Sequence, residues 1–277
     1  GELDTESVAF APPRLVEVDA LLCQAWLLVR MFRFGDAFVT LLQLAHSLKT
    51  LGLDGHPAAA EGAALQAHCM VGAGRFREAG LMLEYLTPQT VEARHANDAT
   101  GLLLRCAGQL REILLDVEGA AGSYKQAAEA YTEEHGTSDS PDVVECTLHA
   151  LRVRFHAGLA PEAHQLMRRH IETLERLLGK EHPAVSAALA DAADALLPSR
   201  AHDACHALYS QAAHALSTRC GDPHPLAARA RARLALLAHT AGPAARGYAD
   251  ALTHTESALR ALVLRVGRTH ASLYGVL

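Results

Sequence analysis

Aromatic side chains are scarce in this chain of 277 residues, at 5%, and the sequence contains a single tryptophan. Its core must therefore be aliphatic, and the many Ala and Leu residues favour helices over strands. Charged residues make up 20% and apolar residues 50%, a composition that excludes a disordered or fibrous chain. We expect an all-α protein.

Signals for membranes, secretion and nucleic acids are also missing. No apolar run approaches the roughly 18 residues of a membrane span, and no secretory signal is visible. Acidic residues outnumber basic ones, 31 to 25, which argues against a dedicated nucleic-acid binder. The cysteines lie far apart without a Cys-x-x-Cys pair, which suits reduced thiols. We therefore expect a cytoplasmic protein without membrane insertion.

Four prolines mark a period in the chain. Pro57, Pro141, Pro183 and Pro225 are separated by 84, 42 and 42 residues. Such a period of about 20–50 residues is typical of repeat proteins. The same spacing gives six units that start near residues 15, 57, 99, 141, 183 and 225, followed by a stub from residue 270. We expect residues 15–277 to form a single repeat array and residues 1–14, which start with Gly and not Met, to be a linker or a remnant of recombinant expression.

Small side chains recur at fixed places in this period. Ten residues after the start, four of the six units carry Ala. Twenty-two residues after the starts stand Ala37, Ala79, Ala121, Ala163, Cys205 and Gly247. Small residues at fixed places let two helices approach closely. Each unit is therefore predicted to consist of helix A, a short turn, helix B and a loop.

Glycine and proline mark the expected turns. Gly74 and Gly158 stand 17 residues after their unit starts, where a left-handed residue would end helix A. In the first unit Gly35 stands three residues later, so we expect a shifted turn there. Pro13 should precede the first helix and Pro88 should follow a helix B, so that no proline falls inside a helix.

Three motifs carry a resemblance to a known family. They are Gly-Arg-Phe-Arg-Glu-Ala at 74–79, Gly-Leu-Ala-Pro-Glu-Ala at 158–163, and Gly-x-x-His-Pro loops that end at Pro183 and Pro225. The motifs resemble tetratricopeptide repeats (TPRs) of the long, 42-residue type, as in kinesin light chains and nephrocystin-like proteins. HEAT-like repeats have a similar period but would not be expected to show these motifs. The resemblance implies a right-handed α-solenoid of about six helix-turn-helix repeats that binds a protein or peptide ligand in a concave groove lined by the A helices.

Helical spacing nominates side chains for this groove, because residues three or four apart share a face of helix A. The nominated residues are Asp19, Trp26, Arg30, Glu61, His68, Leu110, Glu145, Arg152, Phe155, His156, Asp194, Arg229, Arg233 and His239. For each of them the alternative is packing against a neighbouring repeat. An Asn that contacts ligand in kinesin light chains is replaced here by residues such as His149, Asp191 and Arg233. The ligand type of that family therefore does not carry over.

Charge is unevenly distributed along the chain. Residues 219–277 carry a net charge of +5 and residues 1–218 a net charge of −11. A basic end could attract an acidic partner segment, although a solvated helix face is the simpler explanation. Arg229, Arg231 and Arg233 alternate along a helix, so at most two of them can serve one site.

Motifs for catalysis and metal binding were sought without success. His202, Cys205 and His206 share a helix face, but tetrahedral zinc needs a further ligand, and Cys205 occupies a small packing position. Phosphate-binding loops, nucleophile elbows and zinc-protease motifs are absent from the sequence. We therefore expect no catalytic residue, metal or cofactor. His56, His182, His224 and His270 are expected to make hydrogen bonds at helix starts or within loops.

Two hypotheses for function remain open. The first is a non-enzymatic interaction scaffold or adaptor that binds a peptide or protein segment in the concave groove. The second is a regulatory TPR array of a larger multidomain enzyme whose catalytic domain lies outside this chain. An exposed apolar array end also leaves homodimerisation open.

Overall fold

The computed structural model describes residues 13–92, 97–158, 163–197, 201–221, 224–241, 255–256, 259–260 and 263. In these residues the chain forms eleven α-helices and no strand, which confirms the all-α prediction. The helices are α1 (Pro13–Arg30), α2 (Phe34–Thr50), α3 (Pro57–Gly72), α4 (Phe76–Glu92), α5 (Asn97–Ile113), α6 (Val117–His135), α7 (Pro141–His156), α8 (Ala163–Leu178), α9 (Pro183–Leu196), α10 (His202–Cys220) and α11 (Pro225–Ala241). None of these helices has the length and apolar composition needed to cross a bilayer.

The odd-numbered helices are the A helices of the repeats, and the even-numbered ones are the B helices. The prolines with 42-residue periodicity open α3, α7, α9 and α11, because the first turn of a helix does not use the backbone N–H that proline lacks. The expected histidine caps are confirmed at two of these starts. The Nδ1 atoms of His56 and His182 each accept a hydrogen bond of 3.2 Å from the backbone N–H two residues later.

The predicted small positions lie where helices meet. Ala37, Ala79 and Cys205 are fully buried, and Ala121 is 7% exposed. The side chain of Ala163 and the whole of Gly247 lie outside the described residues. Around these contacts the core is filled by aliphatic side chains and by the buried tyrosines Tyr124, Tyr131 and Tyr209. The close approach of the helix pairs therefore rests on methyl-sized side chains.

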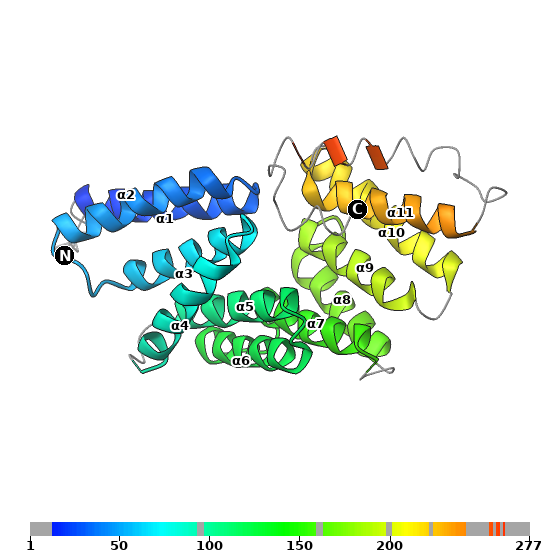
Figure 1. The fold of residues 1–277 in the computed structure, drawn as a ribbon, viewed down its shortest axis with the longest axis horizontal. Helices are drawn as coiled ribbons and strands as arrows, with labels where there is room; N and C mark the ends of the chain where they lie inside the picture. Colours follow the sequence, from blue (N-terminus) through cyan, green and yellow to red (C-terminus); the bar gives the residue numbers. More distant parts are fainter. Residues whose placement is uncertain are drawn as a thin grey trace, which may run out of the picture.

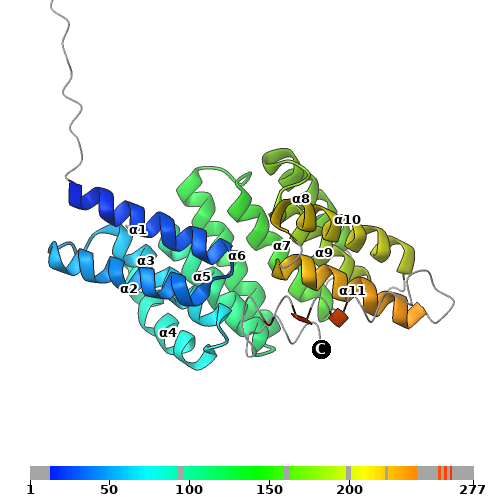
Figure 2. The same ribbon diagram turned by 90° about the horizontal axis from the view of Figure 1, so that it is seen from above.

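The helix pairs stack into a curved array. In Figure 1, α1–α2 and α10–α11 lie on the same side of α5–α6, with α5 on the inner side of the bend and α6 on the outer side. Figure 2 shows the pairs following one another from α1–α2 to α10–α11. Five helix pairs and a sixth A helix form an α-solenoid of about six repeats, as predicted. A helices also contact the next A helix, as in α1–α3, α3–α5 and α7–α9.

The prediction of a shifted first turn is wrong. Phe32 takes the left-handed conformation (φ 58°) 17 residues after the expected unit start, as Gly74 (φ 77°) and Gly158 (φ 74°) do in their units. Gly35 lies inside α2. The prediction took Gly35 as the turn residue of the first unit, whereas Phe32 adopts the left-handed backbone there. Its ring packs edge-on against Phe34, with 5.8 Å between centroids.

The placement of two prolines also differs from prediction. Pro13 is the first residue of α1, where proline fits well. Pro88 lies inside α4, which continues to Glu92. Proline lacks the backbone N–H that would bond to the carbonyl oxygen of Glu84, so α4 forgoes one hydrogen bond near its C-terminal end. Pro161, Pro198, Pro223 and Pro243 lie outside the described residues.

Candidate binding face

The residues nominated for peptide contact all lie on A helices, from α1 to α11. Asp19, Arg30 and His239 are exposed, whereas Leu110 and Asp194 are buried. The side chain of His156 lies outside the described residues. The other nominated residues are partly buried: Trp26, Glu61, His68, Glu145, Arg152, Phe155, Arg229 and Arg233. Many of these side chains contact one another across neighbouring A helices.

The first contact joins α1 to α3. The indole Nε1 of Trp26 donates a hydrogen bond of 2.6 Å to the Oε1 atom of Glu61. The guanidinium of Arg30 lies 6.0 Å from the centroid of the Trp26 ring, within the range of a cation–π interaction. This end of the A-helix face therefore presents a partly exposed aromatic ring with one acidic and one basic neighbour.

The second contact joins α3 to α5. The Nδ1 atom of His68 lies 3.6 Å from the Sγ atom of Cys106. Burial lowers the pKa of His68 to about 4, and the positive charges of Arg105 and Arg30 act in the same direction. His68 is therefore neutral near pH 7, so it can pack between helices without a counterion.

Ion pairs join α5 to α7. Arg105 lies 3.0 Å from a carboxylate oxygen of Glu145. Arg152 makes a two-point contact with Glu112, at 2.7 Å and 2.8 Å. The hydroxyl of Tyr124, on α6, donates a hydrogen bond of 3.1 Å to Glu112 as well. Two parallel guanidinium–carboxylate contacts fix both distance and orientation, so they set how α5 and α7 pack.

The ion pairs continue from α7 to α9 and α11. The Nε atom of Arg152 lies 3.6 Å from Asp191, and Arg229 lies 3.0 Å from the other carboxylate oxygen of Asp191. Burial alone would raise the pKa of Asp191, but Arg152 and Arg229 outweigh it and hold the pKa below its ordinary value. Asp191 therefore remains a carboxylate that links two neighbouring A helices.

Asp194 makes the last contact of the series. Arg229 and Arg233 approach its carboxylate at 2.7 Å and 3.0 Å, and Tyr209 of α10 donates a hydrogen bond of 2.5 Å to it. Arg231 instead donates a hydrogen bond of 2.7 Å to Ser217 on α10. The prediction that at most two of these three arginines share a site is confirmed.

Together these contacts form a polar ladder that runs across the A helices from α1 to α11. Its members are Trp26, Glu61, His68, Arg105, Cys106, Glu112, Glu145, Arg152, Asp191, Asp194, Arg229 and Arg233. Four arginines are paired with four carboxylates in the ladder, so these eight charges cancel. The fifth carboxylate of the ladder, Glu61, instead accepts the hydrogen bond from Trp26. A face with this arrangement is pre-ordered, and most of its charge is already balanced, before any ligand arrives.

Several ladder residues were not nominated from the sequence. Arg105, Glu112 and Asp191 complete the ion pairs, and a signal for them exists in the sequence. Arg152 and Glu112 stand 40 residues apart, and Arg229 and Asp191 stand 38 apart, so opposite charges recur at nearly one repeat length. Asp191 and Arg233 also occupy the place of the ligand-contacting Asn in kinesin light chains.

The described part of the chain shows neither a metal-binding cluster nor an activated cysteine thiol. It contains no cluster of three or more His, Cys, Asp or Glu side chains placed to hold a metal ion. Cys205 is buried, as expected, with its Sγ atom 3.5 Å from the carbonyl oxygen of Ala193. Burial raises the pKa of the Cys69, Cys106 and Cys146 thiols to about 12, which makes them poor nucleophiles.

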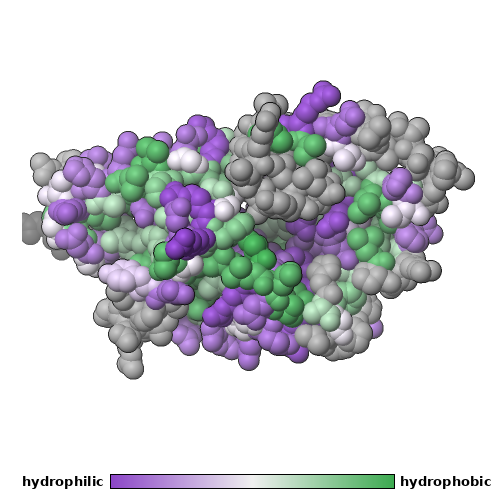
Figure 3. Space-filling view, viewed as in Figure 1, coloured by the Kyte–Doolittle hydropathy of each residue, from purple (hydrophilic) through white to green (hydrophobic). Residues whose placement is uncertain are grey.

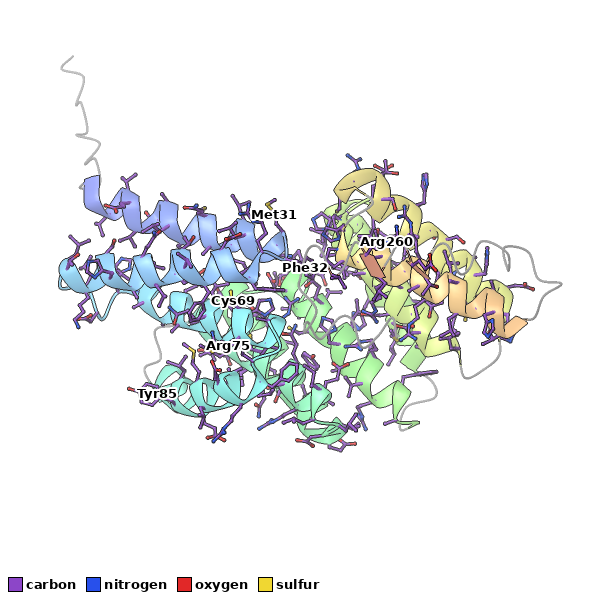
Figure 4. The ribbon with its side chains drawn as sticks, turned by 45° about the horizontal axis from the view of Figure 1, so that its top comes forward. Met31, Phe32, Cys69, Arg75, Tyr85 and Arg260 are labelled. Atoms are coloured by element: carbon purple, nitrogen blue, oxygen red, sulfur yellow. The ribbon has the colours of Figure 1, made fainter. Side chains whose placement is uncertain are left out.

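Exposed apolar side chains occur on both kinds of helix. On the B helices, Leu42, Leu81 and Tyr85 are more than half exposed, and Figure 4 shows Tyr85 pointing away from the array. On α11, Leu236 is 47% exposed and follows Arg233 by three residues, so it lies on the stripe of the ladder. On the face drawn in Figure 3, apolar surface gathers over the middle of the array, between polar regions.

Comparisons with known proteins identify the fold. No protein-family model matches the sequence, and no curated protein matches it significantly. The structure is similar to that of BtubC (BKLC) from P. vanneervenii, with a TM-score of 0.54 and 16% identity over 90% of this chain and 92% of that one. It is also similar to a putative kinesin light chain with nearly identical TPR-like repeats from P. anserina, with a TM-score of 0.53 and 16% identity over 76% of this chain and 97% of that one. The chain thus folds as a TPR-like array that resembles kinesin light chain repeats.

Proposed function

We propose that this chain is a non-enzymatic scaffold that binds an extended peptide or protein segment along the A-helix face. The observation that carries the proposal is the polar ladder, because it gives neighbouring A helices one continuous, pre-ordered surface. A rigid surface costs less conformational entropy on binding than a loose one does. We place this activity in the cytoplasm and assign residues 15–277 to a single array.

The ladder also indicates which ligand chemistry fits. Its arginines and carboxylates are already paired, so a strongly charged ligand would have to break existing ion pairs. Aromatic and apolar side chains on the same helices keep some exposed surface: Trp26 and Phe155 are partly buried against the core, and Leu236 is 47% exposed. Aromatic residues in a partly desolvated setting are frequent energetic anchors of interfaces. We therefore propose a ligand segment whose apolar side chains contact this face. Exposed Arg30 would form an ion pair with one acidic residue of the ligand beside Trp26.

The buried nominated residues have a different role in this proposal. Leu110 and Asp194 are too buried to contact a ligand directly, and they hold the face in place. Asp194 does so by pairing with both Arg229 and Arg233. The direct contacts are assigned to the exposed and partly buried residues: Asp19, Trp26, Arg30, Glu61, His68, Glu145, Arg152, Phe155, Arg229, Arg233 and His239.

A peptide selection tests the proposal. Peptides selected against the intact chain from a random display library are labelled, and their dissociation constants are measured by fluorescence anisotropy. Trp26→Ala and Leu236→Ser should each weaken binding at least tenfold, whereas Leu81→Ser on the B helix α4 should leave it unchanged. Circular dichroism confirms that each variant keeps its helicity. If Leu81→Ser weakens binding and the A-helix variants do not, the binding face is assigned to the wrong side of the array.

A further inference from the structure

The turn between α1 and α2 contains a strained aromatic residue. Phe32 holds a left-handed backbone with φ 58°, a conformation that bulky side chains rarely adopt. At the same place in other repeats, Gly74 and Gly158 adopt it without a steric cost. Non-glycine residues persist in such conformations when the surrounding structure over-determines them. Leu115 adopts the same backbone (φ 62°) between α5 and α6 with its side chain 85% exposed, so the conformation alone does not assign a role to the side chain. What distinguishes Phe32 is the set of contacts that its ring makes.

The Phe32 ring connects the two ends of the array. It meets the imidazole of His224 edge-on, with 5.2 Å between centroids and 87° between planes. His224 immediately precedes Pro225, the first residue of α11. The first repeat and the last described A helix therefore touch, although 191 residues separate Phe32 and His224 along the chain. Figure 4 shows Phe32 in the space between the two ends of the array, with Met31 on the outer side of the same turn.

The contact continues from Phe32 toward the polar ladder. Phe34 packs edge-on against Phe32, and its ring lies 6.1 Å from that of His68, also edge-on. Gly72 makes room for Phe34, because a Cβ atom at residue 72 would lie 2.6 Å from the Phe34 ring. An aromatic row thus runs from His224 through Phe32 and Phe34 to His68, a ladder residue on α3.

We propose that Phe32 and His224 form a latch that holds the two ends of the solenoid together. The backbone strain at Phe32 is retained because a glycine in its place would bring no ring to His224. With the latch closed, one edge of the A-helix face is bounded by the joined ends, and release of the latch opens that edge. The coupling to ligand entry rests on the proposed function, whereas the closure of the array does not.

Distances measured without ligand test the closure. Spin labels are attached to cysteines introduced at two exposed positions, Gln43 on α2 and Gln211 on α10. Cys23 and Cys220, which are exposed and partly buried, are first replaced by Ser so that they do not take up label. Pulsed electron–electron double resonance measures the distance between the two labels. For Phe32→Gly and for His224→Ala, the mean distance should be longer and its distribution broader than in the parent chain. Phe32→Gly relieves the backbone strain, so the turn itself should remain folded. Met31→Ala, at the same turn, is the matched control and should leave the distribution unchanged.

The results separate the latch from the binding proposal. The latch is overturned if Phe32→Gly and His224→Ala both keep the parental distance distribution, whatever the peptide data show. If the latch is correct, selected peptides should associate with Phe32→Gly at least threefold faster than with the parent chain. If Phe32→Gly has longer label distances but the same peptide association rate as the parent chain, the latch does not control ligand entry. The closure of the array by Phe32 and His224 would still be supported. If no peptide binds the chain, this result would contradict the proposed function but not the latch.

Discussion

Arg152 and Glu112 face each other across α7 and α5 in a two-point contact, with Nη1–Oε1 at 2.7 Å and Nη2–Oε2 at 2.8 Å. The same guanidinium reaches Asp191 on α9 through its Nε atom. One arginine therefore holds carboxylates from both neighbouring repeats. The stability of a solenoid depends largely on the interfaces between neighbouring repeats, so such a residue affects the stability of the array directly.

Loss of Arg152 should be costly. Arg152→Met removes the arginine counterion of Glu112 and leaves Asp191 with Arg229 alone. Because the Glu112 side chain is 30% exposed, the loss should lie at or below the lower end of the about 3–5 kcal/mol that is typical of a fully buried pair. Urea denaturation of the intact chain measures the free energy of unfolding. Arg168→Ala is the control, because its ion pair with Glu172 is exposed and worth less than about 1 kcal/mol. Similar small losses in both variants would show that the ladder does not stabilise the array.

Trp26 should report ligand binding directly. It is the single tryptophan of the chain, so intrinsic fluorescence observes the α1–α3 contact alone. A bound peptide should shift the emission toward the blue by excluding water from the indole. Trp26→Phe keeps a ring but loses the donor to Glu61, and we expect it to weaken peptide binding about threefold to tenfold, or about 0.7–1.4 kcal/mol. An unchanged spectrum at saturating peptide would contradict the placement of Trp26 in the site.

Stability should fall as the pH drops below neutrality. The pKa of His68 is lowered to about 4 and that of His149 to about 3, in both cases first by burial and then by nearby arginines. Between these values and the ordinary pKa of 6.5, the unfolded chain binds more protons than the folded chain, so acid favours unfolding. At pH 5 each histidine should cost about 2 kcal/mol relative to pH 7.5.

Urea denaturation at the two pH values measures this loss, and His149→Gln should reduce its size. Asp191 does not contribute in this window, because its lowered pKa places its titration at more acidic pH. Equal stability at pH 5 and pH 7.5 would be inconsistent with neutral buried histidines in the folded array.

Two glycine-to-alanine substitutions should have opposite effects on the stability of the fold. A Cβ atom at Gly108 on α5 would lie 2.8 Å from the Tyr124 ring, which is held by its bond to Glu112 and by stacking on His149 at 5.2 Å. Gly108→Ala should therefore destabilise the chain by about 1–3 kcal/mol. Gly122 on α6 has open space around it, so Gly122→Ala should stabilise by about 0.5–1 kcal/mol. Thermal melts measure both, and a gain for Gly108→Ala would contradict the packing of α5 against α6.

The repeat architecture was predictable because it depends on local, periodic signals. Proline spacing located the starts of α3, α7, α9 and α11, and small residues such as Ala37 and Ala79 located the helix contacts. The first turn was predicted incorrectly because phenylalanine rarely adopts a positive φ, so the sequence favoured Gly35 over Phe32 as the turn residue. The Phe34 and His224 rings that surround it come from α2 and from the far end of the chain.

The polar stripe along the A helices was predictable in outline, but its pairing was not. Spacing placed Glu145, Arg152, Asp194 and Arg229 on one stripe. The structure joins Arg152, Arg229 and Asp194 in one network through Asp191, whereas Glu145 pairs separately with Arg105. Their partners could not be chosen from the sequence, because which charges meet depends on the stagger between neighbouring repeats. Arg152 illustrates the consequence: it was nominated as a ligand contact, and the structure gives it two carboxylate partners within the array.

Photo-crosslinking tests the central claim most directly. A selected peptide that carries a benzophenone group is irradiated with the intact chain, and the crosslinked residues are identified by mass spectrometry. Binding along the A-helix face predicts crosslinks on α1, α7 and α11, near Trp26, Phe155 and Leu236. Crosslinks concentrated on α2 and α4, near Leu42, Leu81 and Tyr85, would contradict it.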